Sequence, residues 1–315
     1  MTFGQVKGQA RAVKVLSGIL ATGRIPSAIV FSGMEGTGKT LMAMEFSKTI
    51  LCRERKAPAD PPCGFCRDCI AVDKRNHPDL TLVNASYQAQ FLEADPARQK
   101  TLRVDTIRHL RRDMELRSLM GHWKIAIVED AHTLEIEAAN ALLKILEEPN
   151  ARTLWLLVTA QRERLPRTVL SRCFCVMFSP LGEETVRGIL EDLGIDPARA
   201  VDLARLCEGS AGRALALADG DYPESLTAGP LAPVIAAESL PRESFLARAR
   251  VETALFALSQ DLRTRHLKGE LPFRQVSGPL RELVRLRQAL RSNADPRTVM
   301  TLACLEAEAA AASSP

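Results

Sequence analysis

The stretch AIVFSGMEGTGKT, residues 28–40, decides the fold of this chain. Its first five residues form a short apolar run that is typical of a buried strand. The rest, from Gly33 to Thr40, fits the pattern G-x-x-x-x-G-K-[ST], and a helical pattern follows at residues 40–51. Glycines let backbone N–H groups close around phosphate oxygens, and a helix N-terminus adds partial positive charge. The stretch therefore predicts a phosphate-binding loop between a strand and a helix.

The same loop predicts how a nucleotide and its magnesium ion would be held. Lys39 is expected to reach the β- and γ-phosphates, and Thr40 is expected to place its hydroxyl on Mg²⁺. An ordinary strand–helix turn is the alternative. The residues expected to bind ATP are Gly33, Gly36, Gly38, Lys39 and Thr40.

More short apolar runs occur in the first 180 residues, and longer helical patterns separate them. Short runs rich in Val, Ile and Leu with helices between them are typical of a parallel sheet covered on both faces. This part of the chain is therefore predicted to be an α/β domain. Besides residues 28–32, the expected strands are residues 80–83, 125–129, 154–159 and 174–178. The expected helices are residues 40–51, 104–119 and 135–148.

The strand patterns disappear after residue 180, and amphipathic helical patterns take their place. The stretch GDYPESLTAGPLAP, residues 220–233, contains the Gly, Pro and Ser residues that are typical of a linker. The second part of the chain is therefore expected to consist of two groups of helices joined by this linker.

Four cysteines lie together in CRERKAPADPPCGFCRDC, residues 52–69. Two-residue gaps allow neighbouring thiolates to bind one ion from a tight turn, and four thiolates suit tetrahedral Zn²⁺. A structural zinc site is expected, and an iron–sulfur cluster is the alternative because it uses the same kind of ligand. The predicted ligands are Cys52, Cys63, Cys66 and Cys69. The remaining cysteines, Cys173, Cys175, Cys207 and Cys304, lie in apolar patterns and are expected in the core.

Composition describes an ordinary soluble globular protein of 315 residues, with 46% hydrophobic and 25% charged residues. The net charge of +4 permits contact with nucleic acid without requiring it. No apolar run is long enough to span a membrane, and the N-terminal sequence lacks the apolar core of a signal peptide. A cytoplasmic protein is expected, in which the eight cysteines bind metal or are buried rather than form disulfides.

The stretch KIAIVEDAH, residues 124–132, carries two acids out of a predicted strand. An ATP-hydrolysing protein is expected to have aspartate first, beside magnesium, and then an acid that acts on water. Here Glu129 comes first and Asp130 second, so the first acid is longer by a methylene and the second is shorter. A displacement of about 1 Å can cost about a hundredfold in rate. This degenerate pair predicts ATP binding with slow hydrolysis or none, unless the acids only cap the next turn.

Five features occur together in this chain and carry a resemblance to a known family. They are GRIPSAIVFSG at residues 23–33, the four-cysteine insertion, HPDL at 77–80, AANALLKILEEP at 138–149 and LSRC at 170–173. In these features the chain resembles the clamp-loader branch of the AAA+ ATPases, and more closely the delta-prime type of bacterial DNA polymerase III subunit.

The resemblance implies three domains. The first is an AAA+ module of parallel sheet and flanking helices at residues 1–178, with a zinc module at about residues 52–69. A small helical lid is implied at residues 179–220, and an all-α collar domain for oligomerisation at residues 221–315.

The resemblance also implies roles for three further residues. Thr159 matches the first sensor position, where a hydroxyl can detect the γ-phosphate, although it could simply end a buried strand. Arg172 matches an arginine finger that reaches the ATP of a neighbouring subunit in trans. Arg213 in GSAGRAL lies near the second sensor position, where a neighbouring glycine or alanine could equally align.

The function that follows is a delta-prime-type subunit of the replicative clamp loader, which helps to load the sliding clamp on primed DNA. It is expected to bind ATP weakly or structurally and to supply the arginine finger to the neighbouring ATPase subunit. Its expected partners are the gamma/tau motor and delta subunits, with the clamp and primer-template DNA reached through the complex. Polymerase activity is expected only through membership of the holoenzyme. The alternatives are an active ATPase of the gamma/tau type and, more remotely, an unrelated P-loop kinase.

Direct DNA contact is a separate hypothesis. The predicted helix TIRHLRRDMELRSL carries a run of arginines that could contact a duplex backbone, although such runs are more often a solvated face. They are Arg108, Arg111, Arg112 and Arg117.

Overall fold

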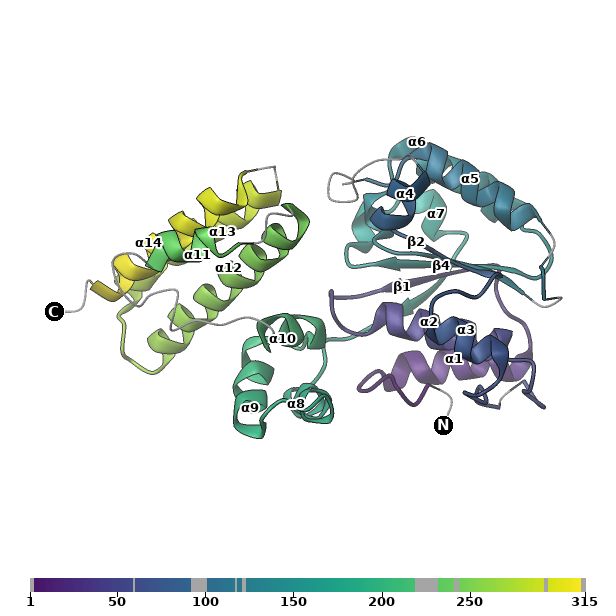
Figure 1. Ribbon diagram of the computed structural model, residues 1–315, viewed down its shortest axis with the longest axis horizontal. Coiled ribbons are helices and arrows are strands. Elements are labelled where there is room, and N and C mark those ends of the chain that lie inside the picture. Colours follow the sequence, from purple (N-terminus) through teal and green to yellow (C-terminus); the bar gives the residue numbers. More distant parts are fainter. Residues whose placement is uncertain are drawn as a thin grey trace. The chain divides into compact units, whose positions relative to one another are not determined.

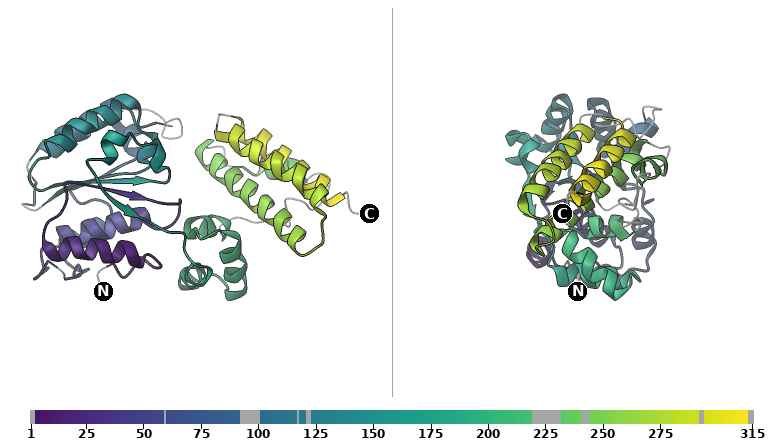
Figure 2. Two further views of the ribbon diagram at one scale, coloured as in Figure 1. Left: turned by 180° about the vertical axis from the view of Figure 1, so that it is seen from behind. Right: turned by 90° about the vertical axis from the view of Figure 1, so that its left-hand side faces the viewer.

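A computed structural model describes residues 3–58, 60–91, 101–116, 118–120, 123–218, 232–240, 244–291 and 294–312. Most of the predicted linker therefore lies outside the described residues. The chain divides into two compact units. Unit 1 consists of residues 1–189 and 209–212, and unit 2 consists of residues 190–208 and 213–315. Figures 1 and 2 show the helices and strands of both units.

Unit 1 is built on a five-stranded sheet in the order β2-β3-β4-β1-β5, and all of its strand pairs are parallel. The predicted strands are confirmed to within one residue at each end. They are β1 (Ala28–Ser32), β2 (Leu80–Val83), β3 (Lys124–Val128), β4 (Thr153–Thr159) and β5 (Phe174–Met177). Because the strands are parallel, their carboxyl ends meet at one edge of the sheet.

Helices cover both faces of this sheet (Figure 1). Alternate strand residues point to opposite faces, so each strand contributes to two hydrophobic layers. Ile29 and Phe31 pack in the layer that includes α1 (Ala10–Thr22) and α2 (Lys39–Leu51), whereas Val30 packs with α5 (Val104–Glu115) and α6 (Ile136–Glu147). The other helices of this region are α3 (Arg67–Asp73), α4 (Ala85–Phe91) and α7 (Arg167–Leu170).

The predicted helix at residues 104–119 is four residues too long, because α5 ends at Glu115. The carboxylate of Asp79, which is fully buried, accepts hydrogen bonds from the N–H groups of Leu119 and Met120 at 2.8 and 2.9 Å. Ser118 Oγ donates to the same carboxylate at 2.8 Å. A buried carboxylate must be satisfied, so these bonds direct residues 118–120 away from the helical path.

Only helices are found beyond residue 180 in the part of the chain that the structure describes, as the sequence predicts. They are α8 (Glu183–Asp192), α9 (Pro197–Leu206), α10 (Ala211–Ala218), α11 (Ala232–Glu238), α12 (Ser244–Leu267), α13 (Phe273–Arg291) and α14 (Pro296–Ala312). The last four share one hydrophobic core within unit 2. No described helix combines the length and apolarity needed to cross a bilayer. The predicted division into three domains stays a prediction.

Candidate functional site

The phosphate loop, residues 33–40, leads directly from β1 into α2, as the sequence predicts. Gly36 and Gly38 have φ angles of 72° and 91°, which side chains rarely permit. Gly38 is also the N-cap of the 13-residue helix α2. The loop therefore brings glycine backbone with these special conformations to a helix N-terminus, which is where a phosphate group is favoured.

Lys39 closes this loop. Its side chain is buried, and Nζ donates hydrogen bonds to the carbonyl oxygens of Gly33 and Met34 at 2.7 and 2.6 Å. Burial lowers the pKa of Lys39 to about 8, although the carboxylates of Glu35 and Asp130 oppose this shift by favouring the charged form. An ammonium held at a helix N-terminus is suited to bind phosphate.

Thr159 ends β4 directly beside the start of the loop. It pairs in register with Ser32, and its carbonyl accepts the N–H of Gly33 at 3.3 Å. Its hydroxyl accepts the N–H of Gln161 at 3.1 Å and lies 3.4 Å from Nδ1 of His132. The fold thus places Thr159 at the loop, while its role as a sensor stays a prediction.

The two acids have different surroundings. Glu129 accepts a hydrogen bond from Nδ2 of Asn84 at 2.9 Å. Asp130 is exposed, has a positive φ of 46°, and its charge acts on Lys39 and His132. Its carboxylate makes no capping hydrogen bond to the short helix that follows, so the reading of this acid as a simple cap is not supported.

Arg172 lies at the end of α7 and is held within its own chain. Nη2 is 2.6 Å from Oε1 of Glu147, and Nη1 donates to the carbonyl of Thr168 at 3.1 Å. The Arg172 side chain is 37% exposed and that of Glu147 is 50% exposed. The guanidinium is therefore accessible from solvent, and whether it acts as a finger stays a prediction.

Arg213 belongs to unit 2. Its Nη1 is 3.7 Å from Oε2 of Glu208, and its guanidinium carbon lies 5.0 Å from the ring centre of Phe256. The preceding residue, Gly212, belongs to unit 1 and donates its N–H to the carbonyl of Gly36 at 3.1 Å. The assignment of a second sensor to Arg213 stays a prediction.

The four predicted metal ligands come together after α2. The Sγ–Sγ distances are 4.0 Å between Cys52 and Cys66 and 3.9 Å between Cys63 and Cys69, and all four sulfurs lie within 4.8 Å of one another. Zn–S bonds of about 2.3 Å give a tetrahedron with edges of about 3.8 Å. The cluster therefore fits one tetrahedral ion. The four thiolates of a [2Fe–2S] or [4Fe–4S] cluster bind more than one iron atom, so they would not all lie this close together.

Backbone groups prepare these sulfurs to bind a cation. The N–H of Cys66 donates to the sulfur of Cys63 at 3.3 Å, and the N–H of Cys69 donates to that of Cys66 at 3.4 Å. Burial raises the pKa of the Cys63 thiol, but the N–H groups of Cys66 and Phe65 outweigh it and bring the pKa to about 7. The Cys63 thiolate is thus accessible near neutral pH, whereas burial raises the pKa values of the Cys52 and Cys69 thiols.

The HPDL motif joins this metal module to the sheet. Asp68, between the ligands Cys66 and Cys69, accepts Nε and Nη2 of Arg53 at 2.5 and 3.0 Å and lies 3.5 Å from Nε2 of His77. Nδ1 of His77 accepts the N–H of Asp79 at 3.1 Å, and Asp79 holds residues 118–120 before β3. The other cysteines agree with the prediction: Cys207 and Cys304 are buried, and Cys173 and Cys175 pack against the core.

The arginines of α5 look like a solvated face. Arg108 is 3.2 Å from Asp105, and Arg111 is 2.7 Å from Glu115, each pair within the helix. Arg112 is exposed, and Arg117 lies outside the described residues. Intrahelical pairing of this kind gives the DNA hypothesis no added support.

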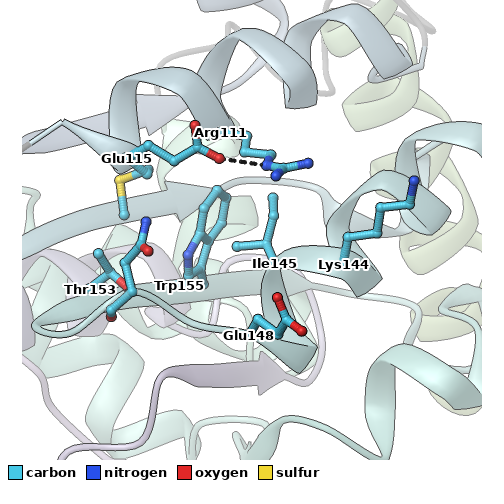
Figure 3. A pocket seen from close by; sticks show the side chains of 9 residues that line it. Arg111, Glu115, Lys144, Ile145, Glu148, Thr153 and Trp155 are labelled. Atoms are coloured by element: carbon cyan, nitrogen blue, oxygen red, sulfur yellow. Dashed lines mark hydrogen bonds and ion pairs between the residues drawn. The ribbon is translucent and has the colours of Figure 1, made fainter.

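A cavity of about 160 Å³ lies between α5 and α6 at the start of β4 (Figure 3). The Arg111–Glu115 ion pair borders it, and the buried Nε1 of Trp155 has no hydrogen-bond partner among the described residues. The remaining lining residues are Met114, Lys144, Ile145, Glu148, Asn150 and Thr153. Since the phosphate loop follows the carboxyl end of β1, this cavity is at the other edge of the sheet and is not part of the nucleotide site.

Several polar residues at the site were not predicted from the sequence. Asn84 directly follows β2, and this position at the carboxyl edge of the sheet could have identified it. His132 follows the acids. Gln9 and Ser210 are far from the loop in sequence, yet both donate hydrogen bonds to its carbonyls.

This arrangement defines the class of the protein. The phosphate loop follows β1 at the carboxyl edge of a five-stranded parallel sheet. Glu129 and Asp130 follow β3 at the same edge, two strands away in the sheet order. Unit 1 therefore contains an AAA+ module of the P-loop class.

The particular family follows from comparison with known proteins. A family model described as "DNA polymerase III, delta subunit" matches residues 8–182, which is more than half of the chain. The chain belongs to this family of DNA polymerase III clamp-loader subunits.

Relatives include two types of subunit. The DNA polymerase III subunit delta' of Bacillus subtilis (strain 168) is 34% identical over 198 residues, which cover 63% of this chain and 56% of that protein. The subunit tau of Escherichia coli (strain K12) is 32% identical over 224 residues, which cover 69% of this chain and 32% of that protein. The chain thus spans about half of the first relative and a third of the second.

A solved structure of a DNA polymerase III gamma subunit-related protein from Thermotoga maritima aligns with 95% of this chain and 99% of that chain. The TM-score of this match is 0.49 and the sequence identity is 17%.

The sulfur geometry predicts that the purified protein contains one zinc ion per chain. Cys63→Ser should remove most of the bound zinc, because three thiolates hold the ion less tightly, and should lower the melting temperature. Cys175→Ser, in the half-buried cysteine away from the cluster, should keep one ion. Elemental analysis by mass spectrometry tests this. Wild-type protein without zinc, or Cys63→Ser with a full equivalent, would contradict the assignment.

The lowered pKa of Lys39 predicts that ADP binds more weakly at alkaline pH. The free protein loses the Lys39 charge as pH rises through about 8, whereas bound phosphate favours the charged form, so binding takes up a proton. The Kd should rise about eightfold between about pH 7.5 and 9, above the phosphate's own pKa of about 6. Calorimetric titration measures this change. Lys39→Arg, which stays charged, should remove the dependence; a wild-type Kd that does not change with pH would refute it.

Proposed function

We propose that this chain is a delta-prime-type subunit of the bacterial replicative clamp loader, which binds ATP, hydrolyses it slowly or not at all, and assists hydrolysis in a neighbouring subunit. The observation that carries this proposal is the combination of a complete phosphate loop with an exchanged acid pair. The family assignment supports the clamp-loader setting. The choice of delta-prime type rests on HPDL, on the order Glu129–Asp130 and on the match to a delta' relative.

Nucleotide binding is assigned to the loop and the first turn of α2. Gly36 and Gly38, with Gly33 before them, allow the backbone conformations that bend the loop around a phosphate, and Lys39 supplies a positive charge beside it. Thr40, in the first turn, presents a hydroxyl for the magnesium ion that accompanies ATP. Mg²⁺ bound with ATP would neutralise phosphate charge; the residues of this chain bind and orient the phosphates.

The acid pair explains why hydrolysis should be slow. Nδ2 of Asn84 donates a hydrogen bond to the longer acid, Glu129, at 2.9 Å. The side chain of the second acid, Asp130, is shorter by one methylene. Activation of water requires a carboxylate within hydrogen-bond reach of it. Binding depends on the loop instead, so an exchange of the acids should cost rate more than affinity.

Arg172 is assigned the task of an arginine finger for a neighbouring subunit. Its resting partner is Glu147, and the pair is partly exposed. Exposed ion pairs stabilise proteins by only about 0–1 kcal/mol. A nucleoside triphosphate bound to another subunit carries several negative charges and can therefore displace Glu147 from the Arg172 guanidinium at little cost in free energy. Thr159 is assigned as the first sensor because it ends β4 beside the loop.

Zinc is assigned a structural role in Cys52, Cys63, Cys66 and Cys69. All four positions of a tetrahedral ion are filled by thiolates, so the site has no open position for a reaction.

A second candidate function is that of a gamma/tau-type active ATPase. It is favoured by the match to tau subunits over 69% of this chain. A kinase of the P-loop class would have an acceptor pocket and act alone, and it leaves the match to the polymerase III family unexplained. Multiple turnover by the isolated protein would favour the gamma/tau reading over the delta-prime reading.

The proposed partners are the gamma/tau and delta subunits, with the sliding clamp and primed DNA engaged through the assembled complex. Co-purification with those subunits tests this directly, because a kinase would have no reason to assemble with them.

The finger assignment predicts that Arg172→Ala slows ATP hydrolysis by a reconstituted loader by about 10³-fold at the neighbouring site, the magnitude known for such arginines. The isolated variant should bind ADP with the wild-type Kd, because Arg172 is held at Glu147 and Thr168, away from its own loop. Steady-state phosphate release by the reconstituted complex measures the first effect.

The matched control is Arg167→Ala, which removes another exposed arginine, from α7 just before Arg172. Its effect on phosphate release should be less than twofold. If Arg172→Ala assembles normally and leaves the rate of the complex unchanged, Arg172 is not a finger.

A further inference from the structure

The peptide carbonyls of the phosphate loop are held one after another by hydrogen-bond donors. Lys39 Nζ holds the first two, and Thr37 Oγ1 adds a bond to the second at 2.7 Å. The next three are held from outside the loop. Ser210 Oγ donates to Glu35 O at 2.8 Å, Gly212 N to Gly36 O at 3.1 Å, and Gln9 Nε2 to Thr37 O at 3.2 Å.

Because the peptide group is planar, the hydrogen bonds to these carbonyls also set the orientation of the neighbouring N–H groups. A trans peptide is planar, and its C=O and N–H point in opposite directions. Each carbonyl fixed toward an outside donor therefore aims the N–H of the next residue to the other side. The three outside donors orient the N–H groups of Gly36, Thr37 and Gly38 in this way. Successive N–H groups that line one concave side form an anion-binding nest.

Ser210 and Gly212 belong to a segment that packs closely against the phosphate loop. Ser210 is fully buried, and the carbonyl of Gly209 is fixed by the N–H of Leu181 at 2.9 Å. A Cβ added to Gly212 would lie 2.8 Å from the Cα of Gly36, and one added to Gly36 would lie 2.2 Å from Ser210 Oγ. The approach is therefore possible only because both positions are glycine.

Gln9 fixes the loop to the sheet. Its side chain is 4% exposed. Nε2 also donates to the carbonyl of Ser179 at 2.7 Å, and Oε1 accepts the N–H of Ser179 at 3.2 Å. Because Ser179 follows β5 closely, the amide that holds Thr37 O is itself held by the chain leaving the sheet.

We propose that Gln9, Ser210 and Gly212 are positioning residues that preorganise the phosphate loop for the β-phosphate of a nucleoside diphosphate or triphosphate. The proposal rests on the nucleotide binding proposed above. These residues act through the loop backbone, so their loss should weaken binding of the phosphate chain rather than of the nucleoside.

Calorimetric titration of the full chain with ADP and with AMP tests this proposal. Ser210→Ala should bind ADP about three- to tenfold more weakly, the worth of one lost hydrogen bond, while its Kd for AMP changes less than twofold. Gly212→Ala should show the same selective loss. Gly188→Ala is the matched control, because a Cβ added there meets nothing within 4 Å, and both of its Kd values should equal those of the wild type.

The outcomes separate the two proposals. If wild-type protein does not bind ADP, or binds it equally well after Lys39→Ala, the proposed nucleotide binding is wrong and the positioning role falls with it. If wild-type binding depends on Lys39 but Ser210→Ala and Gly212→Ala retain wild-type Kd values for ADP, only the positioning role is wrong. An equal loss of ADP and AMP affinity together with a lower melting temperature would also overturn it, since that is the result of general destabilisation.

Discussion

A peptide group cannot turn its carbonyl and its N–H to the same side, and the phosphate loop of this protein depends on that constraint. Five successive carbonyls, from Gly33 to Thr37, are bound by donors within the protein. The N–H groups that face the other way are thus oriented before any ligand arrives. Two donors come from segments more than 100 residues apart in the sequence, Gln9 and Ser210. The geometry of the loop is therefore a property of the folded unit and not of the loop sequence alone.

Helix α2 connects the loop to the metal module. It begins at Lys39 and its C-cap is Cys52, the first of the four thiolate ligands. Lys48 of α2 is 2.7 Å from Asp73, the last residue of the helix α3 that carries Cys69. An ion bound by the four cysteines would thus hold α2 at one end while the phosphates bind at the other. This arrangement suits a structural metal, because it stabilises the helix whose N-terminus receives the anion.

Sequence patterns predicted the strands to within one residue because each is a short buried apolar run between breakers. They also predicted the loop and the cysteine cluster, since in both the ligands are close in sequence. The end of α5 was predicted wrongly because the buried Asp79 carboxylate, 40 residues away from Leu119, decides where the chain turns. Asn84, Gln9 and Ser210 could not be predicted as loop or acid partners, because long-range packing brings them there. The roles of Thr159, Arg172 and Arg213 depend on a ligand or a neighbouring subunit.

The central proposal is that this chain binds ATP in the phosphate loop and hydrolyses it slowly or not at all. The most direct measurement is to incubate the purified protein with ATP and Mg²⁺, remove unbound nucleotide, denature the protein and separate the released nucleotide by chromatography. The account predicts intact ATP at close to one per chain, and more ADP from the double variant Glu129→Asp/Asp130→Glu, which restores the order of a hydrolysing site. Wild-type protein that releases mainly ADP, or no nucleotide at all, would contradict it.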